Sequence, residues 1–587
     1  MSLESKLKKI VNKKNIFFEI KENIVFFKGV VRNYDEWIDV GLKTGQLKGV
    51  EGVVNNILWD KNQNSIRKKI NDERLKIFNS QKNKNAGTFD IVVIGAGLIG
   101  CFIARELSKY QTSVVVLEKG CDVGLGASRA NNGMIHPGIA PDFNTLKRKL
   151  NIRGNILYDK VCSELDVSFK RVGSLILVTP GTLEKYKNKI PGFLYRFILK
   201  KILPILAKRK GKKNGVKDIE IIKGDKIFKL EPWATKETLL AIYIPSTGIL
   251  DPHELNIAIS ENAKDNGVKI QLDTEVIGFN KVGKKITGVV TSKGKFNCKL
   301  VINAAGVSSD EIADLAGSKE FTIHPRKGVE ILFNKNLKPG INHCIAELII
   351  PTPVTSKGGG VNPAIHGNII WGPTAVEIPS KTDTTVSREE INQMLDKYST
   401  VVNDDFPKKK MIRYFAGVRA PTFTEDFIIR PAKWVENLIH VAGIQSPGLA
   451  SAPAIAKYVV ELVQKQGFSK EKNSNFNPIR KRISSAADIS LEELHKRIEK
   501  DPSWGNIVCT CETISEAEIV EAINRGAQSI DAVKRRTRAG MGNCQLSYCR
   551  LRIAKILSRE LKIPLNQVVK ESADSKLYNG IVRGEKQ

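Results

Sequence analysis

Four cysteines near the end of the chain have the spacing of a metal or cluster site. Cys509 and Cys511 form a CxC pair, and Cys544 and Cys549 form a CxxxxC pair. Four thiolates can hold either a zinc ion or a 2Fe-2S centre. Zinc ribbons usually carry CxxC knuckles, which neither pair has. From the residues alone, a 2Fe-2S centre, a zinc site and four unrelated buried thiols remain the alternatives.

A glycine-rich turn far upstream has the setting of a dinucleotide site. The apolar run Asp90–Ile94 predicts a buried parallel strand, and Gly95, Gly97 and Gly100 follow it before a helical segment. Gly95 would allow the turn, Gly97 would let a pyrophosphate approach the backbone, and Gly100 would let the helix pack on the sheet. Glu118 ends the next strand and could accept hydrogen bonds from a ribose. The motif alone does not distinguish FAD from NAD.

The segments that follow indicate FAD. Gly124–Gly138 resembles the second flavin-contacting loop of the D-amino-acid oxidase-like superfamily, and Thr274–Val276, Val301–Gly306 and Val441–Leu449 match that superfamily in the same order. The resemblance spans about residues 89–465. It implies oxidation of a C–H bond beside an amine or hydroxyl, with hydride transfer to FAD.

The resemblance also implies which residues contact FAD. The last motif would place a helix N-terminus under the flavin ring, where it could stabilise the negative charge of the reduced form. The expected FAD-binding residues are Gly95, Gly97, Gly100, Glu118, Ala127, Ser128, Asn132, Gly133, Val276, Ala305, Gly306, Gly443, Gly448 and Leu449.

Within this superfamily the chain is most similar to glycerol-3-phosphate dehydrogenases of the multi-subunit, anaerobic kind, and next to L-2-hydroxyglutarate dehydrogenases. The shared segments are Asn132–His136, Ser246–Pro252, His324–Gly328, Pro363–Asn368, Trp371–Pro373 and Phe415–Arg419. The chain departs from the family at Pro137–Pro141, where many glycerol-3-phosphate dehydrogenases place Arg-Tyr. Either another residue recognises the phosphate, or the substrate is a 2-hydroxyacid; the resemblance favours glycerol 3-phosphate.

The reaction requires a base for the hydroxyl and cations for the anionic end of the substrate. His136 could take the hydroxyl proton, because imidazole titrates near neutrality; an orienting hydrogen bond is its alternative role. Arg419 offers a forked donor to phosphate or carboxylate, unless it forms a structural salt bridge. Arg326 and Lys327 are further candidate cations, and His366 is a further candidate for the pocket.

The cysteine region resembles the bacterioferritin-associated-ferredoxin-like (BFD-like) domain, which holds 2Fe-2S. The matching residues are Ile507–Glu512, a helix from Ser515 whose Glu518 suggests a capping box, and Gly540–Cys549. The resemblance makes Cys509, Cys511, Cys544 and Cys549 the cluster ligands. It implies an electron path from substrate through FAD and the cluster to a partner subunit, such as a second flavoprotein, or to quinone. An electron-transfer subunit without turnover of its own is the third functional alternative.

These sites require several domains, which agrees with a length of 587 residues and 41% hydrophobic residues. We expect a small α/β domain at 1–60, a linker at 61–88, an FAD-dependent oxidoreductase of FAD-binding and substrate subdomains at 89–467, a connector at 468–488 and a helical iron–sulfur domain at 489–587. The overall class is therefore α/β, with a Rossmann-like FAD-binding domain and an interleaved α+β substrate domain.

The first sixty residues read as helix, two strands, helix and strand. Strand-like runs at Ile16–Ile20 and Ile24–Phe27 are joined by a polar turn, and a third run follows at Val50–Trp59. This αββαβ order, with Gly49–Asn56, resembles the BON domain, a module associated with phospholipid surfaces. A general docking domain is the alternative.

The net charge of +31 is concentrated in two segments that contain no acidic residue. Residues 185–217 carry 12 basic residues around the apolar run 193–206, and residues 532–559 carry eight, around the cysteines. The first is typical of an interfacial helix on an anionic membrane surface, or of a buried hairpin covering the substrate pocket. The second could stabilise an anionic cluster or dock a partner. No nucleic-acid fold accompanies these charges, so we expect no nucleic-acid binding.

The distribution of apolar residues and cysteines bears on location. No run of about 18 uncharged apolar residues occurs, and the first residues lack a signal-peptide core. Nine cysteines, four of them in one site, suit a reducing compartment. We expect a cytoplasmic protein, peripheral on the inner face of the cell membrane if the basic segment contacts lipid.

Overall fold

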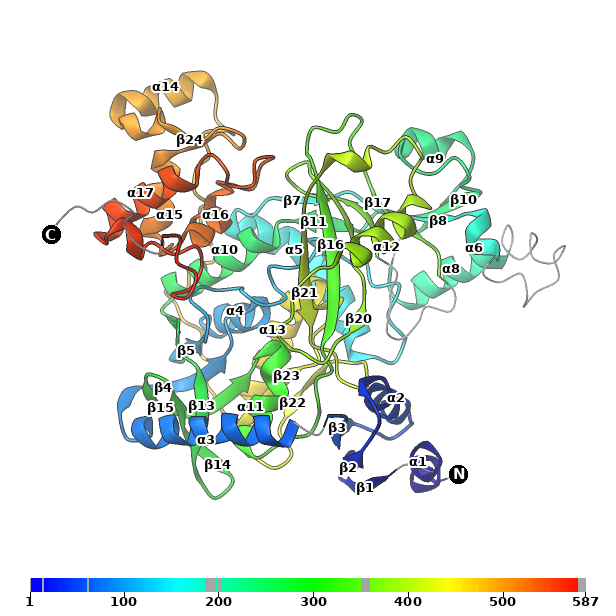
Figure 1. Ribbon diagram of the computed structural model, residues 1–587, viewed down its shortest axis with the longest axis vertical. Helices are drawn as coiled ribbons and strands as arrows, with labels where there is room; N and C mark the ends of the chain where they lie inside the picture. The colour runs from blue at the N-terminus through cyan, green and yellow to red at the C-terminus, as the bar shows by residue number, and fades with distance from the viewer. Residues whose placement is uncertain are drawn as a thin grey trace.

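The computed structural model describes residues 2–12, 15–60, 63–184, 197, 202–216, 218–349 and 359–578. Two small units lie at opposite ends of a large central part (Figure 1). The predicted α/β class is confirmed. Most of segment 185–201, Lys217 and part of the predicted interfacial helix lie outside the described residues.

The N-terminal unit has the predicted αββαβ order. Its elements are α1 (Leu3–Val11), β1 (Ile16–Lys21), β2 (Ile24–Val30), α2 (Tyr34–Gly45) and β3 (Gly52–Leu58). Strand β2 is antiparallel to β1 and parallel to β3. The core of this unit includes Phe423 from the central part, whose ring lies 5.1 Å from that of Trp37. The unit is therefore packed into the molecule.

The predicted linker is mostly ordered. Helix α3 (Gln63–Gln81) follows the N-terminal unit, and β4 (Asn85–Ile94) begins four residues before the expected boundary at Phe89. The strand is longer because β15 (Gly294–Asn303) also extends, so that Asn85 pairs with Lys295.

The first central layer is an eight-stranded sheet with the order β12-β5-β4-β15-β14-β13, to which β23 and β22 add beside β15. Its other strands are β5 (Val114–Leu117), β12 (Lys269–Gln271), β13 (Val276–Val282), β14 (Lys285–Thr291), β22 (Ile428–Pro431) and β23 (Leu438–Ala442). Its helices are α4 (Leu98–Leu107), α5 (Leu146–Leu165), α10 (Pro252–Asp265), α11 (Ser309–Ala316) and α13 (Gly448–Lys465).

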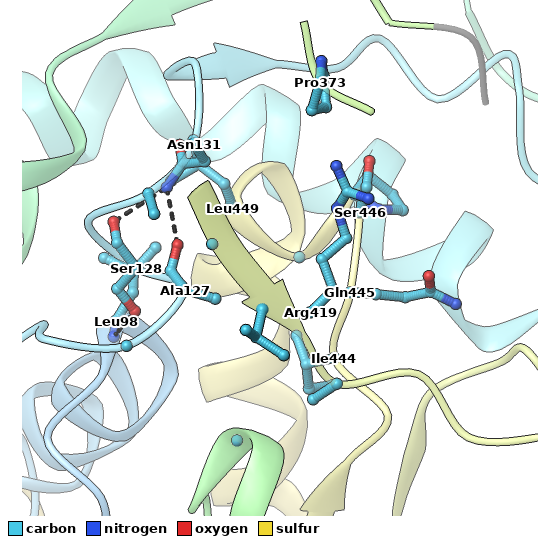
Figure 2. Close-up of a pocket in the computed structure, with 18 of the residues that line it drawn as sticks. Leu98, Ala127, Ser128, Asn131, Pro373, Arg419, Ile444, Gln445, Ser446 and Leu449 are labelled. Carbon is cyan, nitrogen blue, oxygen red and sulfur yellow. Dashed lines mark hydrogen bonds between the residues drawn. The ribbon is translucent and has the colours of Figure 1, made fainter. Parts of the chain in front are cut away.

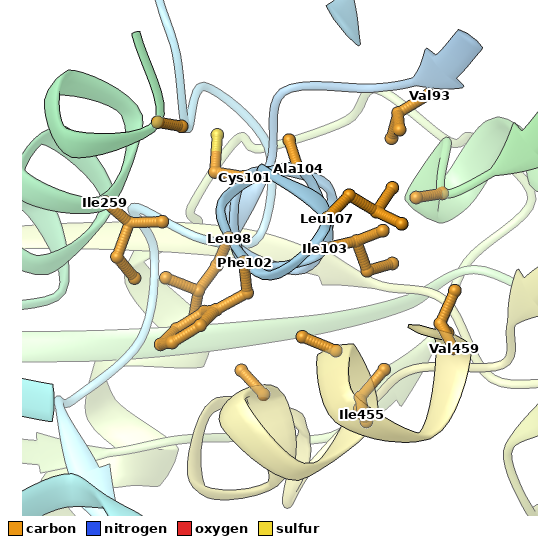
Figure 3. Close-up of a cluster of buried hydrophobic side chains, with 14 of the residues drawn as sticks. Val93, Leu98, Cys101, Phe102, Ile103, Ala104, Leu107, Ile259, Ile455 and Val459 are labelled. Carbon is orange, nitrogen blue, oxygen red and sulfur yellow. The ribbon is translucent and has the colours of Figure 1, made fainter. Parts of the chain in front are cut away.

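Helix α4 is buried in the centre of this layer. Figure 3 shows its apolar side chains packed between Ile259 of α10, Ile455 and Val459 of α13, and Val93 of β4. This packing fixes the N-terminus of α4 at the end of β4, directly after the predicted glycine-rich turn.

The second central layer is a nine-stranded sheet, ordered β20-β16-β19-β18-β17-β8-β10-β9 with β21 also paired to β16. The strands are β8 (Ser174–Val178), β9 (Glu220–Ile222), β10 (Leu240–Ile244), β16 (Arg326–Phe333), β17 (Cys344–Glu347), β18 (Gly360–Pro363), β19 (Ile369–Gly372), β20 (Val376–Glu377) and β21 (Met411–Arg419). Helices α6 (Pro180–Glu184), α8 (Leu203–Lys213), α9 (Asp225–Leu230) and α12 (Arg388–Ser399) accompany it.

Side chains alternate between the two faces of β16. Val329, Ile331 and Phe333 lie in the apolar core of the second layer. Arg326 and Glu330 point the other way and line a cavity. A small sheet of β6 (Met134–Ile135), β11 (Gly248–Leu250) and β7 (Phe169–Arg171) accompanies the two large sheets.

The C-terminal unit is mostly helical, as predicted. It contains α14 (Leu491–Lys500), β24 (Ile507–Cys509), β25 (Ile514–Ser515), α15 (Glu516–Asn524), α16 (Ile530–Thr537) and α17 (Arg550–Leu561). The predicted capping box is confirmed: Ser515 and Glu518 bond reciprocally at the start of α15. Among the described residues, no helix is both long and apolar enough to cross a membrane.

Candidate active site

A cavity of about 730 Å³ lies between the two central sheets. The glycine-rich turn, the 124–141 loop and the start of α13 line one side, and strands of the second sheet line the other. Figure 2 shows residues from these separate segments facing one space.

The glycine-rich turn has the backbone geometry that the sequence predicts. Gly95 has φ +102°, a conformation that favours glycine. A Cβ on Gly100 would lie 1.9 Å from the carbonyl oxygen of Gly95, so the helix and the turn touch there. Gly97 is the N-cap of α4 and lines the cavity. A helix start that lines the cavity is suited to a pyrophosphate.

Most residues expected to bind FAD line the cavity. They are Gly95, Gly97, Glu118, Ala127, Ser128, Asn132, Ala305, Gly306, Gly448 and Leu449. Gly100, Gly133, Val276 and Gly443 do not line it. Instead, a Cβ on Gly133 would meet the carbonyl of Leu250 at 2.0 Å, and Val276 is buried in the sheet core. These positions therefore shape the backbone or the sheet around the cavity.

Glu118 and Ser128 organise the walls of the FAD half. The two carboxylate oxygens of Glu118 accept hydrogen bonds from Ala96 N at 2.7 Å and Gly120 N at 2.8 Å. Each oxygen keeps a second lone pair for a ribose hydroxyl. Ser128 Oγ accepts from Leu98 N at 2.9 Å. Asn131 donates to the carbonyls of Ala127 and Ser128, as Figure 2 shows. The residues present fit an FAD.

His136 lies in the wall beside the start of α13. Its Nε2 is 3.4 Å from Ser446 Oγ. Its carbonyl accepts hydrogen bonds from Asn151 and Asn155, at 2.9 and 3.0 Å. The imidazole is therefore held at the cavity, between the FAD half and the second sheet.

Two arginines on adjacent strands differ in what they contact. Arg326, opposite Arg419 in the register, is only 2% exposed and donates to Glu377 at 2.6 Å, Glu425 at 2.5 Å and Gln445 at 3.1 Å. Among the described residues, no hydrogen bond or ion pair engages the Arg419 guanidinium, although it lines the same cavity. Burial lowers the pKa of Arg419. Arg419, and not Arg326, is the cation available to a ligand.

Lys327 and His366 do not line the cavity, which corrects two expectations. Lys327 follows Arg326 on a pleated strand and so points to the opposite face, where its Nζ pairs with Glu390 at 2.9 Å. His366 Nε2 lies 3.2 Å from Asp251 Oδ2, beside the C-terminal unit. Both residues lie in segments that match the family, His324–Gly328 and Pro363–Asn368, but the sequence does not show which way each side chain points.

Glu330 and Asn362 are cavity residues that the motifs did not indicate. Glu330 is 2% exposed and Asn362 is fully buried. Within the described structure, Glu330 Oε2 and both amide atoms of Asn362 lack a hydrogen-bond partner. Burial raises the pKa of Glu330 to about 8, against the opposing effect of Arg419. The period of two along β16, counted from Arg326, could have indicated Glu330.

The four expected cluster ligands converge in the C-terminal unit. Cys511 Sγ lies 3.9 Å from Cys509 Sγ and 3.7 Å from Cys544 Sγ. A hydrogen bond with Cys509 lowers the pKa of Cys549. Gly540 N donates to Cys509 Sγ at 3.4 Å, and a Cβ on Gly542 would come within 2.5 Å of Cys511 Sγ. Gathered thiols with backbone donors fit a 2Fe-2S centre. In the part of the chain that the structure describes, no group of three or more His, Cys, Asp or Glu side chains is arranged to hold a single metal ion.

Buried ion pairs attach the C-terminal unit to the FAD half. Asp122 pairs with Arg535 at 3.0 Å and with Arg536 at 2.8 Å, and all three side chains are at most 6% exposed. Glu571 bridges Arg535 and the cavity residue Arg129. The cysteine unit is thus docked next to the cavity wall.

A second set of contacts joins the cysteine loops to the second sheet and its neighbours. Glu512 pairs with Lys335, which lies just beyond β16, at 3.1 Å. Gln545, next to Cys544, accepts from Arg413 of β21 at 3.0 Å. The two attachments hold the thiols in one orientation against the oxidoreductase part.

Comparison with known families identifies the class of protein. Residues 90–462 match the FAD dependent oxidoreductase family, and residues 507–559 match the BFD-like [2Fe-2S] binding domain. The chain therefore belongs to the FAD dependent oxidoreductase family and carries a C-terminal 2Fe-2S binding domain. The expected cofactors, FAD and 2Fe-2S, are confirmed, and the zinc alternative is not supported.

Individual relatives narrow the class. The glycerol 3-phosphate dehydrogenase of Caloramator mitchellensis is 39% identical over 503 residues, which are 85% of this chain and all of that protein. The glycerol 3-phosphate oxidase of Mycoplasma genitalium is 32% identical over 67% of this chain and 98% of its own. The dithionite-reduced L-alpha-glycerophosphate oxidase of Mycoplasma pneumoniae, with FAD bound, aligns with a TM-score of 0.59 and 26% identity, covering 67% of this chain and 98% of that chain.

Proposed function

We propose that the protein oxidises sn-glycerol 3-phosphate to dihydroxyacetone phosphate and delivers the electrons through its 2Fe-2S centre to an external acceptor. The observation that carries this proposal is Arg419, a cavity guanidinium without a protein partner in the described structure. It would provide a phosphate site on another strand, in place of the arginine that is missing at Pro137–Pro141. The full-length similarity to a glycerol 3-phosphate dehydrogenase supports the same substrate.

The residues of the chain divide the work of binding and proton transfer. Arg419 would hold the phosphate by a forked pair of hydrogen bonds. His136, held at its backbone by Asn151 and Asn155, would take the proton of the hydroxyl that is oxidised. FAD, when bound by the glycine-rich turn and the 124–141 loop, accepts the two electrons that leave the substrate. The buried arginine Arg326 would position the site through Glu377 and Glu425.

The electron acceptor would be a partner subunit, such as a second flavoprotein, or quinone. Tyr548, between two of the thiols in sequence, is 83% exposed, and Arg550 and Arg552 are exposed beside it. An exposed aromatic with two cations beside the thiols is a suitable surface for such an acceptor. We propose no nucleic-acid partner.

For the parts beyond the two matched families, we propose an order of domains and a location. The N-terminal domain (1–60) would be BON-like, followed by the linker (61–88), the oxidoreductase (89–467), the connector (468–488) and the 2Fe-2S domain (489–587). The αββαβ order supports the first assignment. The protein would be cytoplasmic and peripheral on the inner face of the membrane, supported by exposed Ile205 and Leu206 on the lysine-rich helix α8.

A 2-hydroxyacid such as L-2-hydroxyglutarate is the second candidate substrate, because Arg419 would bind a carboxylate equally well. Anaerobic addition of each compound to the purified, cofactor-loaded protein separates the candidates. We expect glycerol 3-phosphate to bleach the flavin absorbance and L-2-hydroxyglutarate to leave it unchanged. The reverse result would establish the hydroxyacid, and no bleaching by either would indicate an electron-transfer subunit.

A further inference from the structure

The side of the cavity that the second sheet forms, here called the roof, carries a polar subsite. In the described structure its polar atoms lack hydrogen-bond partners. Glu330 Oε2, Asn362 Oδ1 and Asn362 Nδ2 are buried there without hydrogen bonds. A buried polar group without a partner costs about 1–3 kcal/mol. Three such atoms, on two residues that line one cavity, point to a polar ligand that satisfies them.

The strand register sets these groups in a row. Arg419 lies over Gly328, since a Cβ there would be 2.4 Å from its Nη2. Glu330 follows Gly328 two residues on, about 7 Å along the strand. The register places Gly372 and Gly360 in adjacent positions across the sheet from Glu330, and Asn362 follows two residues beyond Gly360. The roof therefore runs from a cation to a carboxyl and then to an amide, and Gly328 and Gly372 make room for the Arg419 and Glu330 side chains.

We propose that Glu330 and Asn362 form the subsite that binds the terminal hydroxyl group of the substrate, while Arg419 binds its phosphate. The inference rests on the proposed function and specifies the chemistry of its substrate: a phosphate at one end and a hydroxyl at the other. An amide and a carboxyl can each accept and donate a hydrogen bond to one hydroxyl. A ligand without this hydroxyl would leave Glu330 and the Asn362 amide without the hydrogen bonds that the hydroxyl supplies.

The charge of Glu330 makes the subsite sensitive to pH. The titratable groups that interact with its charge are Arg419 and Tyr398, and burial raises the pKa of Tyr398, so the phenol stays neutral. Arg326, Cys344 and His136 line the same cavity. With its own pKa near 8, Glu330 is uncharged at neutral pH and gains a negative charge above it. A dianionic phosphate ester would then bind less well in alkaline solution.

The test compares two substrates on the full-length, cofactor-loaded protein. Glycerol 3-phosphate has the terminal hydroxyl, whereas 2-hydroxypropyl phosphate keeps the phosphate and the oxidised hydroxyl but lacks the terminal one. Anaerobic flavin reduction is followed against substrate concentration. For the unaltered protein we expect glycerol 3-phosphate to be preferred at least about tenfold in kcat/KM.

Glu330→Met and Asn362→Leu should each reduce this preference to about threefold or less. Glu330→Gln, which keeps hydrogen bonding without the charge, should retain the preference and remove the rise in KM above pH 8. The matched control is Glu237→Gln, an exposed carboxyl of the same sheet region. A merely structural role would slow both substrates equally and leave their ratio unchanged.

The outcomes distinguish an error in the proposed function from an error in the proposed hydroxyl subsite. If glycerol 3-phosphate fails to reduce the unaltered protein, the proposed function is wrong and the inference fails with it. If it does reduce the protein but Glu330→Met keeps the full preference for the terminal hydroxyl, only the inference is overturned.

Discussion

At the scale of single residues, the difference between Arg326 and Arg419 decides the chemistry of the cavity. Both are cations on adjacent strands, Arg326 buried and Arg419 half-buried, but two carboxylates and an amide occupy Arg326. Arg419 lies beside Glu330, which burial keeps mostly neutral near pH 7. A cation next to a neutral acid retains its attraction for an anionic substrate.

Replacing Arg419 should therefore weaken substrate binding. We expect Arg419→Ala to raise KM about 100-fold, corresponding to about 2–3 kcal/mol of lost charge-assisted hydrogen bonding, and Arg419→Lys to raise it about tenfold because the fork is lost. Steady-state kinetics with an artificial acceptor would measure this. Arg388→Ala removes an exposed arginine outside the cavity and should change nothing. An unchanged KM in Arg419→Ala would exclude Arg419 as the phosphate site.

At the scale of elements, helix α16 attaches the cysteine unit to the FAD half through Asp122. Burial opposes ionisation of this carboxyl, but the hydrogen bonds and charges of Arg536 and Arg535 outweigh it and lower its pKa to about 2. Because this value is below that of the unfolded chain, the ionised Asp122 stabilises the fold by about 2 kcal/mol. That contribution is complete above about pH 4 and is lost as the pH falls toward 2.

Asp122→Asn should loosen this attachment. It leaves two buried guanidinium groups without a counter-charge, so we expect a loss of about 3–5 kcal/mol at pH 7. Thermal unfolding and protease cleavage in the connector 468–488 would report it. Asp574→Asn, an exposed carboxyl of the same unit, should behave as the unaltered protein. The difference between the unaltered protein and Asp122→Asn should shrink as the pH falls from 5 toward 2; a constant difference would contradict the role of the charge.

At the scale of the whole molecule, a continuous series of packed side chains connects the N-terminal unit to the wall of the cavity. Phe423 inserts between Trp37 and His324, with the His324 ring stacked on it at 4.6 Å. His324 Nδ1 lies 2.9 Å from Glu377, which in turn binds Arg326. The N-terminal unit is therefore connected to the cavity wall through contiguous contacts.

Phe423→Ala should separate the N-terminal unit from the rest. Removal of this buried ring, which is 1% exposed, should cost about 3–5 kcal/mol and make the N-terminal unit more susceptible to protease. Differential scanning calorimetry and limited proteolysis would measure the two effects. Phe17→Ala provides a matched control, because Phe17 is 71% exposed on β1. Equal effects of the two substitutions would argue against an integrated N-terminal unit.

The sequence by itself determined the parts of the protein that depend on local spacing. The glycine turn after a buried strand indicates a dinucleotide site, and the CxC and CxxxxC pairs indicate a site for four thiolates, because each depends on residues close together in the chain. The resemblance of the 124–138 loop and of the cysteine region to known families then indicates FAD and 2Fe-2S. The capping box of α15 and the αββαβ order are local in the same sense, and both were predicted correctly.

Only the tertiary structure decided which polar side chains face the cavity and which are already paired. Glu425, 99 residues away in the chain, pairs with Arg326, which the sequence alone makes a candidate for binding the substrate. Because side chains alternate along β16, Lys327 points away from the cavity and Glu330 points into it. Asn362 lines the cavity from β18, another strand of the same sheet. Partners so distant in sequence leave no local pattern, because they are brought together by sheet register and the packing of separate layers.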